Sequence, residues 1–190
     1  MKTETKMPVH FLKGNKVYLR PLDIDDSEIY FQMVYNTETR RLTGTQKSYT
    51  REQISSYIEN KAGDSSSVLL LIALKETNEV IGDIALQDID TINRSSHIRI
   101  AIDAEQNQGK GYGSEAITLM LEYGFGILNL HRIELEVFSF NNRAEHVYEK
   151  LGFKKEGIQR DRLYYDHQYH DAILMSMLED EFRAMKKQMK

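Results

Sequence analysis

The sequence predicts a mixed α/β fold with one central sheet flanked by helices. Strand-like apolar runs alternate with amphipathic helical stretches, and a glycine-rich turn joins a strand to a helix near the middle of the chain. With 190 residues, of which 41% are hydrophobic, the chain can bury one substantial core, and no composition shift marks a second domain. We therefore expect a single domain over residues 1–190 that ends in a charged helical tail at 179–190.

The N-terminal part predicts one strand and two helices. Residues 17–22 have strand character, and Asp23 or Asp25 can cap a helix that runs to about residue 36. Thr50 begins a Thr-Arg-Glu-Gln capping box, in which threonine and glutamine side chains bond each other's backbone N–H groups. A second helix should therefore start after this threonine.

The central part predicts a hairpin followed by a β-α-β unit. Two apolar runs, 68–74 and 80–86, flank a turn and should pair antiparallel. A strand at 97–103, a helix at 114–127 and a strand at 132–138 form the β-α-β unit, for which right-handed crossovers are the rule. A short helix and two further strands complete the expected sheet, at 143–151, 153–160 and 169–177.

The turn that opens the helix of this unit has glycines at alternate positions, Gly109, Gly111 and Gly113. The first N–H groups of a helix have no intrahelical partner, and the helix dipole adds partial positive charge there. Glycine permits positive φ and close approach of a ligand, and Lys110 can add a full positive charge. An anionic diphosphate is the ligand that this arrangement favours.

Several phosphate-binding patterns compete for this turn. A Walker loop fails because Lys110 is followed by glycine rather than by serine or threonine. Gly111, Gly113 and Ala116 satisfy a dinucleotide fingerprint, but only 77 residues follow Gly113, too few for the remaining βα units. A third pattern, Gln-x-x-Gly-x-Gly, fits both at 106–111 and at 108–113. A glycine turn without any ligand is the remaining alternative.

The third pattern is typical of the GNAT superfamily of acetyl-CoA-dependent N-acetyltransferases, and a second motif strengthens the likeness. Residues 128–153 resemble the second half of that superfamily's core almost position by position. The likeness is closest to the branch that holds ribosomal-protein N-terminal acetyltransferases and bacterial spermidine acetyltransferases. It covers about residues 15–178 and implies a single GNAT-like domain with a central mixed, mostly antiparallel sheet.

Acetyl transfer from a thioester to an amine needs a neutral nucleophile, support for the oxyanion and a proton for the departing thiolate. Tyr148 occupies the tyrosine position of the motif Asn-x-Arg-Ala-x-x-x-Tyr, and the resemblance implies that it is the general acid. It also shares an apolar helical face with Ala144 and Val147, as a core residue would. Glu136 stands where N-terminal acetyltransferases of the superfamily place a base, although a glutamate there can equally be solvated or ion-paired.

The resemblance also implies acetyl-CoA as the co-substrate and assigns its contacts. Backbone groups of Ile100 and Ile102 would pair with the pantetheine arm, and Asn141 would bond the pantetheine or cap a helix. The pyrophosphate would lie on the glycine turn, bound by Gln108, Gly109, Lys110, Gly111, Tyr112, Gly113 and Ser114. The chemistry needs no metal, and His167 and His170 should lie on opposite faces of an extended segment.

We therefore expect an N-acetyltransferase that acts on a primary amine, preferably the N-terminal α-amine of a ribosomal-type protein. A polyamine such as spermidine or spermine is one alternative acceptor, and a non-catalytic CoA-binding module is another alternative. Polyamine selectivity would need a carboxylate-lined cleft, and the sequence leaves open whether Asp83, Asp88 or Asp166 converge. His97, on the strand before the glycine turn, is either structural or part of the acceptor channel.

The composition of the chain bears on its partners, its location and the chemistry open to it. The net charge of −4 argues against general nucleic-acid binding, and the absence of cysteine excludes disulfides and a cysteine nucleophile. No apolar run approaches membrane-spanning length. We expect a cytoplasmic protein without nucleic-acid or membrane partners, and a homodimer is compatible with the resemblance.

Overall fold

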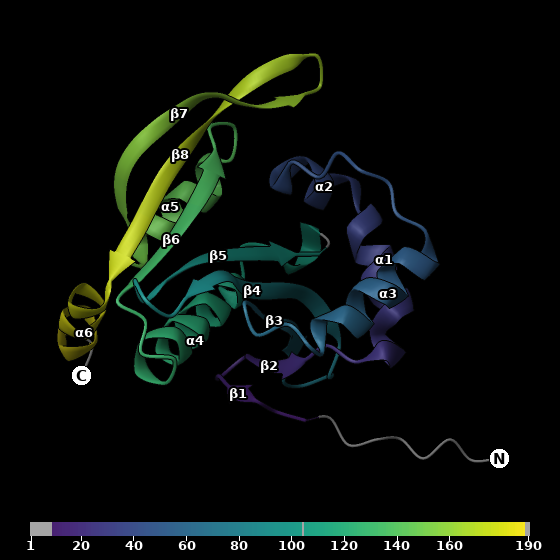
Figure 1. The fold of residues 1–190 in the computed structure, drawn as a ribbon, viewed down its shortest axis with the longest axis horizontal. Helices are drawn as coiled ribbons and strands as arrows, with labels where there is room; N and C mark the ends of the chain where they lie inside the picture. The colour runs from purple at the N-terminus through teal and green to yellow at the C-terminus, as the bar shows by residue number, and fades with distance from the viewer. Residues whose placement is uncertain (1–8, 104, 189–190) are drawn as a thin grey trace.

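A computed structural model describes residues 9–103 and 105–188. These residues form an eight-stranded sheet with helices against both faces, in the order β1-β2-β3-β4-β5-β6-β8-β7 (Figure 1). Neighbouring strands are antiparallel except β5 and β6, which are parallel. The predicted α/β fold with a mixed, mostly antiparallel sheet is therefore confirmed.

The elements alternate along the chain much as the sequence predicts. The strands are β1 (Leu12–Lys13), β2 (Val17–Pro21), β3 (Val68–Leu74), β4 (Val80–Asp90), β5 (Ser95–Ile102), β6 (Arg132–Phe138), β7 (Lys154–Tyr165) and β8 (Gln168–Leu178). The helices are α1 (Ser27–Tyr35), α2 (Thr37–Thr43), α3 (Arg51–Lys61), α4 (Tyr112–Gly126), α5 (Asn142–Lys150) and α6 (Glu179–Gln188). Short 3₁₀ turns lie at Ile24–Asp26 and Glu105–Asn107.

The first two predicted helices differ in their capping contacts. Thr50 Oγ1 accepts a hydrogen bond from Gln53 N at 3.2 Å, and Gln53 Oε1 accepts one from Thr50 N at 2.9 Å, so the capping box of α3 is confirmed. Of the two aspartates predicted to cap the first helix, Asp23 caps the preceding 3₁₀ turn, where its side chain accepts from Asp25 N at 3.1 Å, whereas the N-cap residue of α1 is Asp26, without a side-chain cap bond. Helix α1 itself begins at Ser27.

The structure differs from the sequence predictions in several elements. Strand β1 was not predicted, and β4 ends at Asp90, four residues beyond the predicted end at residue 86. Helix α2 was not predicted, because none of its residues is buried and its sequence has no apolar periodicity; Asn36 caps it by accepting from Thr39 N at 2.9 Å. Helix α4 begins at Tyr112, two residues earlier than predicted. Strands β7 and β8 extend until only Asp166 and His167 separate them, both with positive φ, as a tight two-residue hairpin turn requires.

Two hydrophobic clusters lie on opposite faces of the sheet. The larger cluster contains Met120 of α4 and Phe182 of α6, with Tyr148 of α5 packed against it. The smaller cluster joins α1 and α3 to β3 through Leu71. Side chains alternate along a strand, so α4, α5 and α6 cover one face while α1 and α3 cover the other.

Candidate active site

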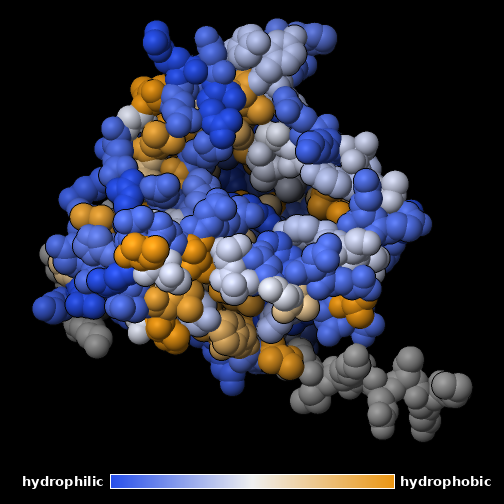
Figure 2. All heavy atoms as spheres, viewed as in Figure 1, coloured by the Kyte–Doolittle hydropathy of each residue, from blue (hydrophilic) through white to orange (hydrophobic). Residues whose placement is uncertain are grey.

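A cavity of about 1300 Å³ lies where β5 and β6 separate. The two parallel strands pair from Ser95–Arg132 to His97–Glu134 and then diverge, β5 staying with β4 and β6 with β8 (Figure 1). Residues from α1, α2, α3, β4, β5, β6, α5 and the start of α4 line the cavity. Its opening shows as a hollow in the surface between β6 and α2 in Figure 2.

The divergence leaves one edge of β5 without a neighbouring strand. Asp103 N donates to Ile81 O of β4 at 2.7 Å, which sets the direction of the backbone groups at the end of β5. Because these groups alternate along a strand, those of Ile100 and Ile102 point to the opposite side, toward the cavity. The predicted pantetheine-binding positions therefore have unpaired backbone groups on the open edge.

The glycine turn leaves the N-terminus of α4 open. Gly109 and Gly111 have φ of +75° and +83°, and Gly111 is the N-cap residue without any side-chain cap bond. A Cβ at Gly113 would touch Ile102 Cγ1 at 3.6 Å, so this glycine packs closely on the end of β5. The first N–H groups of α4 are thus free of a capping side chain, and the backbone geometry fits a diphosphate.

The predicted cofactor residues line the cavity with one exception. Lys110 does not line it; the carbonyl of Lys110 accepts from Lys16 Nζ at 3.0 Å, so its neighbourhood includes a lysine that the motif does not contain. The residues that do line the cavity are Ile100, Ile102, Gln108, Gly109, Gly111, Tyr112, Gly113, Ser114 and Asn141. Asn141 also caps α5, since its Oδ1 accepts from Ala144 N at 3.2 Å.

The sequence left open whether Tyr148 is a core residue or a residue of the active site, and its surroundings fit both descriptions. Its ring packs edge-on against Phe153 with centroids 5.9 Å apart, and it also lines the cavity. Burial raises the pKa of Tyr148 to about 12. Within the described residues its hydroxyl has no hydrogen-bond partner, so a neutral phenol is available to a ligand in the cavity.

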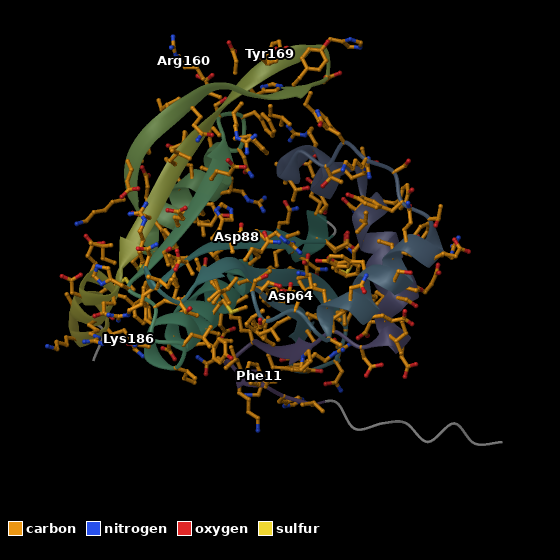
Figure 3. All side chains as sticks on the ribbon, in the orientation of Figure 1. Phe11, Asp64, Asp88, Arg160, Tyr169 and Lys186 are labelled. Atoms are coloured by element: carbon orange, nitrogen blue, oxygen red, sulfur yellow. The ribbon has the colours of Figure 1, made fainter. Side chains whose placement is uncertain are left out.

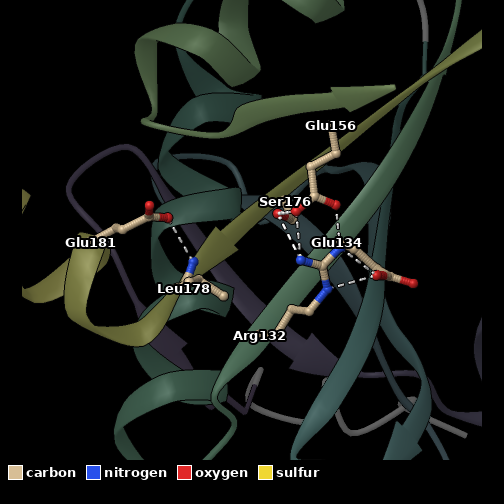
Figure 4. Close-up of polar contacts among 6 residues, drawn as sticks. All are labelled: Arg132, Glu134, Glu156, Ser176, Leu178 and Glu181. Atoms are coloured by element: carbon tan, nitrogen blue, oxygen red, sulfur yellow. Dashed lines mark hydrogen bonds and ion pairs between the residues drawn. The ribbon is translucent and has the colours of Figure 1, made fainter. Parts of the chain in front are cut away.

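Of the two glutamates on β6, only Glu136 lines the cavity. Its side chain is 28% exposed, and its Oε2 lies 3.4 Å from Arg162 Nε of β7. Glu134 is held by Arg132, whose Nη1 also donates to Glu156 Oε1 at 2.7 Å (Figure 4). Ser176 also donates a hydrogen bond to Glu156. The hydrogen bonds from Arg132 and Ser176 lower the pKa of Glu156 to about 2.

The sheet face under α1, α2 and α3 forms the second half of the cavity, here called the acceptor half. Arg99 Nη2 lies 2.6 Å from Asp83 Oδ2, and Asp83 is buried. Tyr30 Oη accepts from Arg99 at 3.4 Å, and its ring stacks on Tyr57 with centroids 6.0 Å apart. Burial raises the pKa of Tyr30, and the charge of Asp83 raises it further.

The acidic residues left open by the sequence do not converge. Asp83 lines the cavity but is ion-paired, whereas Asp88 (labelled in Figure 3) and Asp166 are exposed and are not among the residues that line the cavity. Arg99 and Tyr30 were not among the predicted site residues. A charged residue in the middle of the apolar strand 97–103 was the one sequence signal that pointed to Arg99.

Neither a metal site nor a membrane-spanning helix is found among the described residues. No group of three or more His, Cys, Asp or Glu side chains in residues 9–103 and 105–188 is arranged to hold a metal ion. His170 Nε2 is 3.2 Å from the carbonyl of Tyr165, and His167 lies in the hairpin turn. None of the helices described has the length and hydropathy to cross a membrane.

Comparison with known proteins identifies the family. Residues 16–154 match the acetyltransferase (GNAT) domain family. A spermidine N(1)-acetyltransferase of Escherichia coli K12 is 30% identical over 171 residues, 90% of each chain. The crystal structure of a spermidine N-acetyltransferase from Vibrio cholerae, in complex with CoA and spermine, matches with a TM-score of 0.84 at 26% identity, over 90% of this chain and 99% of that one.

Another relative, which matches only about half of this chain, has a name that refers to a different kind of acceptor. A putative ribosomal N-acetyltransferase of Bacillus subtilis is 33% identical over 105 residues, 55% of this chain and 57% of that protein. With a family match over most of its length and relatives that cover nine-tenths of it, this chain belongs to the acetyltransferase (GNAT) domain family.

Proposed function

We propose that this acetyltransferase moves the acetyl group of acetyl-CoA to a primary amine of a polyamine or a similar small amine. The observation that carries the proposal is the likeness to spermidine acetyltransferases, which spans 90% of this chain in both sequence and structure. The sequence favoured a protein N-terminal amine and kept a polyamine as the alternative. The relatives support that alternative better, and the acceptor preference is corrected accordingly.

The other half of the cavity, formed by the open edge of β5 and the glycine turn before α4 and here called the cofactor half, supports acetyl-CoA as the donor. The open edge of β5 offers backbone groups of Ile100 and Ile102 to the amide groups of a pantetheine arm. The uncapped start of α4, with Gly109 and Gly111 in the left-handed region, suits the pyrophosphate. A thioester held along this edge would have its carbonyl at the point where β5 and β6 diverge.

Tyr148 is the proposed general acid. Tyr148 lines the cavity, its hydroxyl is free of hydrogen bonds within the described chain, and it keeps its proton because burial raises its pKa to about 12. A phenol placed against the sulfur can donate a proton as the C–S bond breaks, so that the leaving group departs as a thiol.

Glu136 is the proposed carboxylate for the cationic acceptor. Two other carboxylates that line the cavity are ion-paired, Glu38 with Arg41 and Asp83 with Arg99 at 2.6 Å. Glu136 has a looser contact, 3.4 Å to Arg162. It is therefore better able than these two side chains to attract an ammonium group or to relay a proton from it through water.

The test is thiol release from acetyl-CoA across a panel of spermidine, spermine, other small amines and peptides with free N-termini. We expect turnover with the polyamines at a kcat/KM well above that with any peptide. Turnover that is confined to peptides would restore the N-terminal acceptor, which the partial likeness to a putative ribosomal N-acetyltransferase favours. Acetyl-CoA binding without turnover on any amine would reject the proposal.

A further inference from the structure

His97 lies at the closed end of the cleft between β5 and β6. It pairs with Glu134 as the last residue of β5 to face β6, and beyond it the strands separate. The side chain of His97 lines the cavity, as do those of Arg99 and Glu136. Because side chains alternate along parallel strands in register, all of these residues belong to the same face of the sheet. His97 is thus at the point where the thioester carbonyl would lie.

The charged groups around His97 are already engaged with one another. Glu134, its register partner, is bound by Arg132 at 2.9 Å. On the same face Asp83 is paired with Arg99, and on α2 Glu38 is paired with Arg41. Arg40 and Tyr30, from α2 and α1, also line the cavity.

The remaining neighbours of His97 also leave its ring nitrogens available. Gln87, its cross-strand partner on β4, is neutral, and Glu136 has its contact with Arg162 at 3.4 Å. Within the described residues neither ring nitrogen of His97 has a hydrogen-bond or ion-pair partner. An imidazole that is half-buried beside a reaction centre and free of protein partners can exchange a proton with a ligand.

A polyamine acceptor makes such a group necessary. The pKa of an alkyl ammonium is about 10.4, so only about four molecules in ten thousand are neutral at pH 7. Glu136 attracts the ammonium by its negative charge, and imidazole is the side chain best suited to take up the proton near neutral pH. Resting on the proposed function, we infer that His97 is the catalytic base that deprotonates the acceptor ammonium.

The proton balance of the reaction follows. His97 accepts one proton from the ammonium and releases it to solvent, and the freed lone pair forms the N–C bond to the thioester carbonyl. The C–S bond then breaks with its electron pair on sulfur, which takes the proton of Tyr148. The second proton leaves the nitrogen as the amide forms and restores Tyr148 through water. The sum is one acetamide, one thiol and one released proton.

The experiment compares His97→Gln and His97→Ala with His146→Gln, a control on α5 whose side chain is 76% exposed. We expect His97→Gln to lower kcat with spermidine about 100-fold at pH 7 while acetyl-CoA binding and the far-UV spectrum stay unchanged. The deficit should shrink as pH rises toward 10, because the amine then loses its proton unaided. Free imidazole should restore activity to His97→Ala and leave His146→Gln unaffected.

The outcomes separate this inference from the proposed function. An unchanged kcat in His97→Gln would overturn the inference while leaving the proposed function intact. A loss that imidazole does not restore, with a pH profile parallel to that of the unmodified protein, would also overturn it, because that pattern reflects a structural role. If the unmodified protein turns over a different amine from the panel, the same comparison is made with that amine. Inactivity of the unmodified protein on every amine would reject the proposed function, and the inference with it.

Discussion

The two halves of the cavity differ in whether backbone or side-chain groups form them. The cofactor half consists mainly of backbone: the open edge of β5, two glycines with positive φ and the uncapped start of α4. The acceptor half consists of side chains from α1, α2, α3 and β4, held by ion pairs such as Arg99–Asp83 and by ring contacts such as Tyr30–Tyr57. Tyr148 and Glu136 lie on the border between them.

The difference explains how one fold can keep its donor and change its acceptor. A backbone site depends on chain conformation, so most substitutions of nearby side chains leave it intact. A site made of paired side chains changes its charge and shape with each substitution. Substitutions in the acceptor half should therefore change stability or the acceptor site, whereas substitutions in the cofactor half should change the affinity for acetyl-CoA.

The largest effect is expected in the acceptor half. Asp83→Asn would leave Arg99 charged in a mostly enclosed position without its counter-charge, and we expect a loss of about 3 kcal/mol in the free energy of unfolding. Urea unfolding measures it. Glu38→Gln removes an exposed ion pair of the same half and should cost less than about 1 kcal/mol. Equal losses in the two variants would show that the buried pair is not a structural support.

The next effect is expected at the border. Tyr148→Phe should lower kcat about 100-fold without changing the dissociation constant of acetyl-CoA, because it removes a proton donor and little packing. Since burial raises the pKa of Tyr148 to about 12, the phenol stays protonated, and kcat should not decline between pH 8 and 10. Tyr123→Phe, which changes a ring on α4 outside the cavity, is the control. Unaltered turnover in Tyr148→Phe would remove this residue as the acid.

A smaller effect is expected in the cofactor half. Gly111→Val places a branched side chain at φ +83°, which strains the turn, and we expect acetyl-CoA to bind about 10-fold more weakly by calorimetry. Gly126→Ala, at the other end of α4 with open space around it, should leave binding unchanged. Binding that survives Gly111→Val would argue against a diphosphate at this helix start.

The smallest effect is expected at an ion pair outside both halves. Hydrogen bonds from Arg132 and Ser176 lower the pKa of Glu156 to about 2, so its stabilisation is present above the ordinary glutamate pKa and is lost as pH falls toward 2. Glu156 is 42% exposed, so the contribution should stay below about 1 kcal/mol. The difference in urea midpoint between the unmodified protein and Glu156→Gln should therefore vanish near pH 2. A difference that persists at pH 2 would contradict the assignment.

The cofactor half could be predicted from the sequence because its signals are local. The glycines, the strand before them and the helix after them are adjacent in the chain, and the family resemblance rests on those same residues. The acetyltransferase class and the acetyl-CoA donor were therefore predicted and are confirmed by the family match and the relatives. The roles of Tyr148 and Glu136, the domain boundaries and a cytoplasmic location remain predictions.

The acceptor half could not be predicted because its residues come together only in the folded chain. The rings of Tyr30 and Tyr57 stack although they belong to different helices, and Asp83 on β4 forms an ion pair with Arg99 on the neighbouring strand β5. Helix α2 supplies Glu38 and Arg41 to the cavity but carries no buried residue, so no apolar periodicity marks it in the sequence.

Most strands and helices and the glycine turn are predictable from the sequence, since periodicity, capping and turn residues act over a few neighbouring positions, and the chemical class followed from the family resemblance of these segments. Folding was needed to show that Glu136 rather than Glu134 faces the cavity, that Asp83 is neutralised by Arg99, and that His97 lies where β5 and β6 separate. Strand divergence and ion pairing are contacts between distant segments, and a linear pattern carries no record of their distances.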